Sequence, residues 1–119
     1  MGINSTEVAY GFGQLGSGFC DTTGAFTPPT GKVIVAIQFL ADTTLSGLVA
    51  DTSAYTKSDG SEGDAFFSHT AVVDANGGGA DATDSSTIFP KGVTIFGRWT
   101  SVTLSGADAD GGIICYFGQ

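Results

Sequence analysis

The sequence predicts an all-β fold, either an antiparallel β-sandwich or a jelly-roll-like small barrel. Short apolar segments alternate with turns rich in Gly, Ser, Thr and Asp, 19 of the 119 residues are glycine, and no segment shows helical spacing of apolar residues. With 41% hydrophobic and 13% charged residues, the chain has a globular composition. We expect a single β domain over residues 1–119, because neither side of the long polar loops could close a core alone.

The strongest strand signal runs from Lys32 to Leu40, after the turn at residues 28–31 and before the polar stretch at residues 41–44. Its apolar residues are almost continuous, which is typical of a strand covered on both faces. We therefore expect this strand to be central in the sheet.

A second long strand is predicted at residues 93–104. Val93, Ile95 and Trp99 share one face of it, whereas Val102 and Leu104 fall on the other. A slip of one residue near positions 100–101 predicts a β-bulge or a strand that changes sheets.

The remaining strands have shorter signals. Residues 113–117 are apolar and follow a short turn, which predicts an antiparallel hairpin with the strand at 93–104. Weaker strands are predicted at residues 7–12, 45–50 and 65–73.

The composition argues against an enzyme and against polyanionic partners. One histidine leaves few groups for proton transfer near pH 7. The net charge of −8 and the scattered cations Lys32, Lys57, Lys91 and Arg98 predict no nucleic-acid partner and no attraction to anionic membranes. No apolar run approaches the ~20 residues of a membrane helix, and no signal peptide is recognisable, so we expect synthesis without a secretion step.

Two motif matches lack the context that their chemistry needs. The segment Gly11 to Gly16 fits GxGxxG, but no helix is predicted after it, so we interpret it as a strand or bend close to another backbone. Residues 74–84 match a calcium-binding EF-hand loop at its first, third and sixth positions, but Gly78 and Ser85 stand where further ligands belong. We predict no cofactor and no metal centre, with a weak cation site at residues 74–84 as the alternative.

The candidate nucleophiles are equally weak. Ser68, His69 and Asp64 are the residue types of a hydrolase triad, but neighbours along a strand point to opposite faces, so we predict no catalytic residue. Cys20 and Cys115 are expected to be small buried apolar side chains, with a disulfide between them as the less favoured alternative.

Two segments carry a family resemblance. MGINSTEVAYGFGQLGS at residues 1–17 and FPKGVTIFGRWT at residues 89–100 resemble small virion proteins of marine tailed bacteriophages, similar to capsid cement or decoration proteins. The resemblance implies a structural protein, made in the host cytoplasm, that binds the major capsid protein on the capsid surface of the virion. The symmetry of icosahedral shells adds the expectation of a homotrimer. The resemblance assigns no site residue.

Residues 1–17 are expected to form a partner-docking arm, because terminal segments without a core position become ordered by docking or by adding to a sheet edge. The expected partner contacts are Ile3, Val8, Tyr10 and Phe12. The alternative function is a carbohydrate- or receptor-binding β-sandwich module of a tail fibre or tip. An exposed Trp99 or Tyr55 in a shallow groove would favour that alternative.

Overall fold

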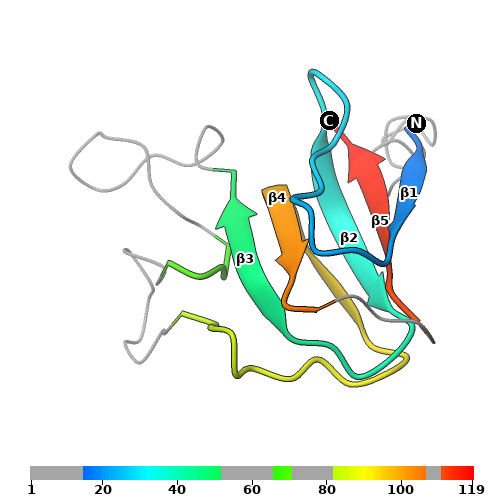
Figure 1. Cartoon of the computed structure of the whole chain (residues 1–119). Coiled ribbons are helices and arrows are strands. Elements are labelled where there is room, and N and C mark those ends of the chain that lie inside the picture. The colour runs from blue at the N-terminus through cyan, green and yellow to red at the C-terminus, as the bar shows by residue number, and fades with distance from the viewer. Residues whose placement is uncertain (1–14, 52–65, 71–81, 107–110) are drawn as a thin grey trace, which may run out of the picture.

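A computed structural model describes residues 15–51, 66–70, 82–106 and 111–119, and the regular structure in these ranges is all β-strand. The strands are β1 (Ser17–Cys20), β2 (Val33–Phe39), β3 (Leu45–Ala50), β4 (Thr94–Leu104) and β5 (Ile113–Gly118). They form one antiparallel sheet in the order β1-β5-β2-β4-β3 (Figure 1). The predicted small all-β antiparallel fold is confirmed. Within these ranges no helix is long and apolar enough to cross a bilayer.

Strand β2 is central, as predicted, because it pairs with β5 on one side and with β4 on the other. A register shift between Ile34 and Ala36 changes the alternation of its side chains. Ile34, Ile37 and Phe39 consequently all join the hydrophobic core and are fully buried. Gln38, which faces away from them, is only half-buried.

Strand β4 changes partners along its length. Its first half, up to Trp99, pairs with β2, and its second half, from Trp99 onward, pairs with β3. Figure 1 shows the two halves, yellow and then orange, running in different directions around a sharp bend. The predicted change of sheet partner is therefore found, and Trp99 lies where it happens.

The bend coincides with the predicted β-bulge. Ala50 pairs with Trp99 and Val49 with Ser101, so Thr100 is an extra residue in β4. An extra residue reverses which face the following side chains occupy. The apolar residues on both sides of the bulge therefore enter the same core: Trp99, Val102 and Leu104.

The segment between β1 and β2 covers the core through Phe26. Phe26 pairs with Val102, with one main-chain hydrogen bond in each direction, 2.8 and 3.0 Å long. The Phe26 ring stacks on Phe117 of β5 with 6.0 Å between ring centroids. Figure 1 shows this blue segment crossing in front of β2 and β5. The core thus lies between two layers. Strands β1, β5 and β2 form the first layer, and β3, the second half of β4 and this segment form the second.

The predicted hairpin between the strand at 93–104 and the last strand is wrong. Strand β5 lies between β1 and β2, so β2 separates it from β4. The physical reason is the bend of β4, which turns the second half of this strand toward β3 and Phe26. These two partners occupy both edges of that half, so β5 cannot pair with it. The chain that leaves Leu104 must therefore cross to the other layer before it pairs.

The weaker strand predictions have mixed outcomes. The strand at residues 45–50 is confirmed as β3. Residues 66–70 of the strand predicted at 65–73 form bends alongside β3, where His69 N donates to Leu48 O at 3.0 Å. The strand predicted at residues 7–12 lies outside the described residues, and β1 was not predicted.

Candidate functional site

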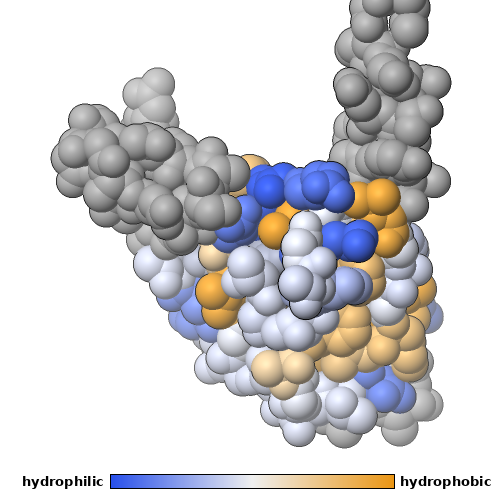
Figure 2. Space-filling view, turned by 90° about the horizontal axis from the view of Figure 1, so that it is seen from above, coloured by the Kyte–Doolittle hydropathy of each residue, from blue (hydrophilic) through white to orange (hydrophobic). Residues whose placement is uncertain are grey.

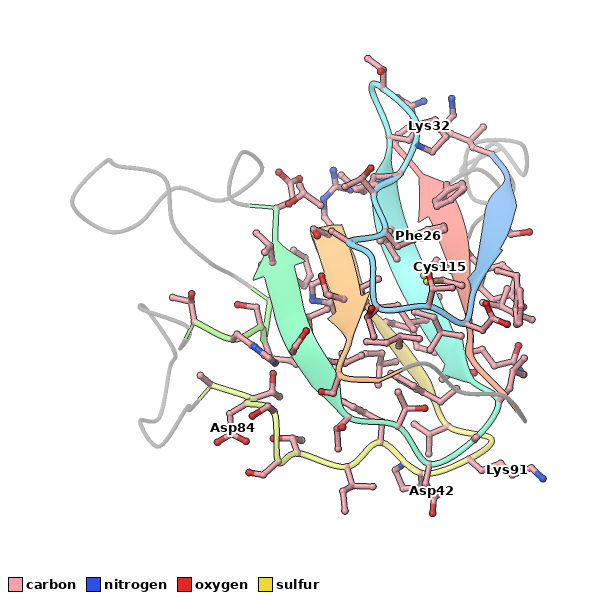
Figure 3. All side chains as sticks on the ribbon, in the orientation of Figure 1. Phe26, Lys32, Asp42, Asp84, Lys91 and Cys115 are labelled. Atoms are coloured by element: carbon pink, nitrogen blue, oxygen red, sulfur yellow. The ribbon has the colours of Figure 1, made fainter. Side chains whose placement is uncertain are left out.

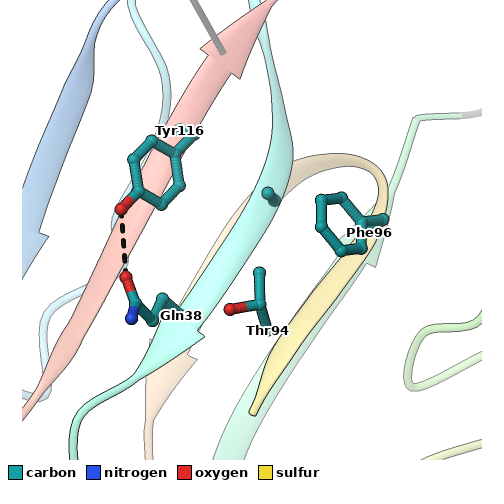
Figure 4. Close-up of a pocket in the computed structure, with 5 residues that line it drawn as sticks. Gln38, Thr94, Phe96 and Tyr116 are labelled. Atoms are coloured by element: carbon teal, nitrogen blue, oxygen red, sulfur yellow. Dashed lines mark hydrogen bonds between the residues drawn. The ribbon is translucent and has the colours of Figure 1, made fainter. Parts of the chain in front are cut away.

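A shallow hollow of about 260 Å³ lies on the sheet face opposite the core (Figure 4). Its lining comes from three neighbouring strands, β2, β4 and β5, and consists of Ala36, Gln38, Thr94, Phe96 and Tyr116. None of these side chains carries a formal charge. We call this site the outer hollow.

The strand register explains why the sheet is hollow here. Ala36 of β2 pairs with Phe96 of β4 on one side and with Tyr116 of β5 on the other. Neighbouring strands lie about 4.8 Å apart, so the two aromatic residues stand about 10 Å apart across β2. The alanine methyl group does not fill the space between them, which leaves a depression flanked by two rings.

One end of the outer hollow is polar. Gln38 pairs with Thr94 in the next row of the sheet, and the Tyr116 hydroxyl donates a 3.0 Å hydrogen bond to Gln38 Oε1 (Figure 4). This bond fixes the amide of Gln38 and occupies its oxygen. Among the residues that the structure describes, neither Gln38 Nε2 nor the Thr94 hydroxyl has a hydrogen-bond partner.

Two large aromatic side chains are exposed on the same face. Phe96 is 66% exposed, and Phe19 of the edge strand β1 is 55% exposed. Phe19 pairs with Ile114, which pairs with Gln38, so Phe19 belongs to the row that forms the polar end of the hollow. Figure 2 shows apolar side chains reaching the surface between polar ones in the view from above. Phe96 borders the outer hollow, whereas Phe19 lies three strands away at the edge of the sheet.

Strand β1 is the outermost strand on its side of the sheet. Its residues Ser17–Cys20 contain no charge and no proline, two devices by which proteins protect exposed strand edges from other chains. No other described strand pairs with its outer edge. The outer main-chain groups of β1 are therefore suited to pairing with a strand of a partner.

The charged groups of the described residues lie away from the outer hollow. Figure 3 shows Lys32 and Lys91 at opposite ends of the molecule. Arg98 Nη2 lies 3.3 Å from Asp51 Oδ2, and Asp51 is buried. Arg98 also donates to the main-chain oxygen of Gln119, so it joins the middle of β4 to the ends of β3 and β5. No local signal in the sequence indicates this ion pair, because Asp51 opens a polar segment and lies 47 positions from Arg98.

Cys20 and Cys115 are buried and are not bridged, as expected. Cys115 pairs with Gly18 and Cys20 with Ile113, which places both thiols on the core side of neighbouring strands. Burial, with the nearby Cys20 thiol as a smaller contribution, raises the pKa of Cys115 to about 12. The Cys115 thiol thus remains protonated and unreactive at neutral pH.

Ser68 and His69 do not form a catalytic pair. The buried Ser68 hydroxyl is engaged by Thr70, accepting from its N and donating to its O, each at 3.0 Å. His69 Nε2 is buried and makes no hydrogen bond to a described residue. Asp64 lies outside the described residues.

Of the two aromatic residues expected to favour a carbohydrate-binding module, the structure describes only Trp99. Trp99 is fully buried in the core. Tyr55 and the expected arm contacts lie outside the described residues, the latter being Ile3, Val8, Tyr10 and Phe12. The residues of the candidate surface that the sequence did not reveal are Phe19, Gln38, Phe96 and Tyr116. Their only signal was the alternation within each strand, which does not show which strands are neighbours.

The motif segments are only partly described. Gly16 is followed directly by strand β1, so GxGxxG does not lead into a nucleotide-binding helix. Most of residues 74–84 lie outside the described ranges. Asp84 closes a local turn, in which its Oδ1 accepts from Ser86 N at 2.9 Å and from Ser86 Oγ at 2.7 Å, and these bonds lower the pKa of Asp84. In the described parts of the chain no three His, Cys, Asp or Glu residues come together as a metal site would require.

The outer hollow and the exposed edge of β1 are therefore the two surface features from which a function can be argued. The hollow lies on the sheet face opposite the core, and the β1 edge borders the same sheet. No family model matches the sequence, and no curated protein or solved structure matches it.

Proposed function

We propose that the protein is a structural component of a bacteriophage virion that binds the outside of the major capsid shell and stabilises it, as a homotrimer at local three-fold positions. Residues 1–17 and 89–100 support this proposal through their resemblance to small virion proteins. The structural observation that carries it is the outer edge of β1, with which no other described strand pairs, and the exposed Phe19 beside it.

Strand β1 is suited to pair with a strand of a neighbouring protein. A strand of the shell, or of a second copy, would pair with its outer main-chain groups, and Phe19 would pack against that partner. Residues 1–14 directly precede this part of the chain, so the expected contacts of the arm would continue the same interface.

Binding of this kind would stabilise the shell by mass action. A protein that recognises the assembled surface, and not the dissociated subunits, shifts the equilibrium toward the assembled state. The rigid antiparallel sheet with its buried core would present the β1 edge in one fixed geometry, which lowers the entropic cost of binding.

The test uses purified virions of the phage that encodes the protein. Immunogold labelling should mark heads, and heads stripped of the protein should release DNA at a lower temperature than untreated heads. Adding the purified protein back should restore the original release temperature. Label on the tail would contradict the proposal and support a receptor-binding module of a fibre or tip. Heads labelled but unchanged in heat release would contradict the stabilising role.

A further inference from the structure

We propose that the outer hollow binds a neutral oligosaccharide, with one sugar ring on Phe96 and another on Tyr116. This site is distinct from the edge of β1 and does not rest on the proposed capsid role. The observations that carry it are the aromatic pair across Ala36, the oriented amide of Gln38 and the absence of charge in the lining.

The aromatic pair supplies two stacking surfaces. Figure 4 shows Phe96 and Tyr116 on either side of β2 on the same face of the sheet. The face of an aromatic ring carries partial negative charge and attracts the partially positive C–H groups of a sugar ring. The backbones of the two aromatic residues stand about 10 Å apart, a spacing that suits two linked sugar rings with one against each side chain.

The polar end of the hollow would orient the bound ligand through hydrogen bonds. The Tyr116 hydroxyl holds Gln38 Oε1, so the amide group points its N–H donors away from that bond. These donors, together with the hydroxyl of Thr94, can exchange hydrogen bonds with sugar hydroxyl groups. A few oriented polar groups beside an apolar surface are the usual composition of a small-ligand site.

The lining excludes charged ligands. An anionic ligand such as a nucleotide would find no cation in the outer hollow and would meet a chain with a net charge of −8. A cationic ligand would find no carboxylate there. Neutral sugars require neither.

The position of the hollow excludes the commonest mode of peptide binding. A peptide adds to a sheet through main-chain hydrogen bonds at an edge strand. The floor of the outer hollow is β2, whose two edges are already paired with β4 and β5. The volume of about 260 Å³ is also below the ~300–1,000 Å³ of pockets that enclose drug-sized ligands, so the ligand would lie on the surface and bind weakly.

The experiment is isothermal titration calorimetry of the full chain with cellotetraose, maltotetraose and laminaritetraose, and with tetragalacturonate as the charged probe. We expect at least one neutral tetramer to bind and tetragalacturonate not to bind. Phe96→Ala should weaken the binding about tenfold, because one stacking surface is lost. Gln38→Met keeps the length of the side chain but removes the donors, and it should weaken binding several-fold. Ala36→Val should fill the hollow and also weaken binding.

The control variant is Val49→Ala, which shortens an exposed apolar side chain on β3, outside the hollow lining. It should bind as the unmodified protein does. Thermal melting of each variant shows that it is folded, and the exposed Phe96 gives a variant that tests the proposal even if Ala36→Val fails to fold. The proposal is overturned if no neutral tetramer binds, if tetragalacturonate binds as well as the neutral tetramers, or if Phe96→Ala and Gln38→Met leave the affinity unchanged.

Discussion

Trp99 and Phe67 are joined in two ways. The indole Nε1 of Trp99 donates a 2.8 Å hydrogen bond to the main-chain oxygen of Phe67, and the two rings meet edge to face with 5.5 Å between their centroids. Trp99 lies at the bend of β4, and Phe67 lies in the short segment that runs beside β3. The pair therefore fixes the position of the bend against the neighbouring layer.

We predict that Trp99→Phe lowers the free energy of unfolding by about 2–4 kcal/mol, because it leaves a cavity in the core and removes the donor to the main-chain oxygen of Phe67. Urea denaturation followed by circular dichroism measures the change. Phe96→Leu alters an exposed ring of the same sheet and should change the stability by less than about 0.5 kcal/mol. Equal losses for the two variants would show that the bend does not depend on Trp99.

Gly97 is required by the close approach of the Trp99 ring. A Cβ atom at position 97 would lie 2.7 Å from Cζ2 of Trp99, which is too close for non-bonded carbon atoms. We predict that Gly97→Ala costs about 1–3 kcal/mol, because the indole ring must shift within a packed core. Gly24→Ala is the matched control, since no atom lies within 4 Å of its Cβ position. Equal decreases in the melting temperatures of Gly97→Ala and Gly24→Ala would contradict this explanation.

Ile34 tests the central position of β2. The side chain is fully buried, so Ile34→Asp would place an unpaired carboxylate in the core and should leave the chain unfolded. Val49→Asp introduces the same group at an exposed position of β3 and should remain folded. A cooperative melting transition for Ile34→Asp, measured by differential scanning calorimetry, would show that the strand is not part of the core.

The raised pKa of Cys115 predicts a loss of stability at alkaline pH. The thiol of the unfolded chain ionises near its ordinary pKa of 9.0, whereas in the folded chain burial raises this pKa to about 12. Below pH 9 both states are protonated and the stability is unaffected. Between pH 9 and 12 only the unfolded state loses the proton, so stability falls by up to about 1.4 kcal/mol per pH unit. Between pH 8 and 10.5 the urea midpoint of Cys115→Ala should fall less steeply with pH than that of the unmodified protein. Parallel dependences of the two midpoints on pH would contradict the prediction.

The strand β2 and the bulge of β4 could be predicted because their signals are local. The apolar run at residues 32–40 identifies a doubly buried strand, and the change of phase between Trp99 and Val102 indicates a bulge or a change of sheet partner. The pairing of β5 could not be predicted from its neighbours in the sequence. It depends on the bend of β4, which is a tertiary feature.

The outer hollow was hidden for the same reason. Ala36, Phe96 and Tyr116 lie on three different strands, and only the register brings the two aromatic residues to opposite sides of the alanine. Phe96 reads in the sequence as one more apolar residue of a core strand. The ion pair of Asp51 with Arg98 similarly joins residues 47 positions apart, and neither position carries a local signal for burial.

The most direct test of the proposed capsid role is co-sedimentation with purified phage heads from which the protein has been stripped. We predict that the unmodified protein, Val49→Glu and Phe96→Ala all sediment with the heads, because none of them alters the edge of β1. Phe19→Glu should remain in the supernatant, since it places a charge on that edge without disturbing the core. Retention of folded Phe19→Glu on the heads at the level of the unmodified protein would contradict the proposal that β1 forms the contact, and failure of the unmodified protein to bind would contradict the capsid role itself.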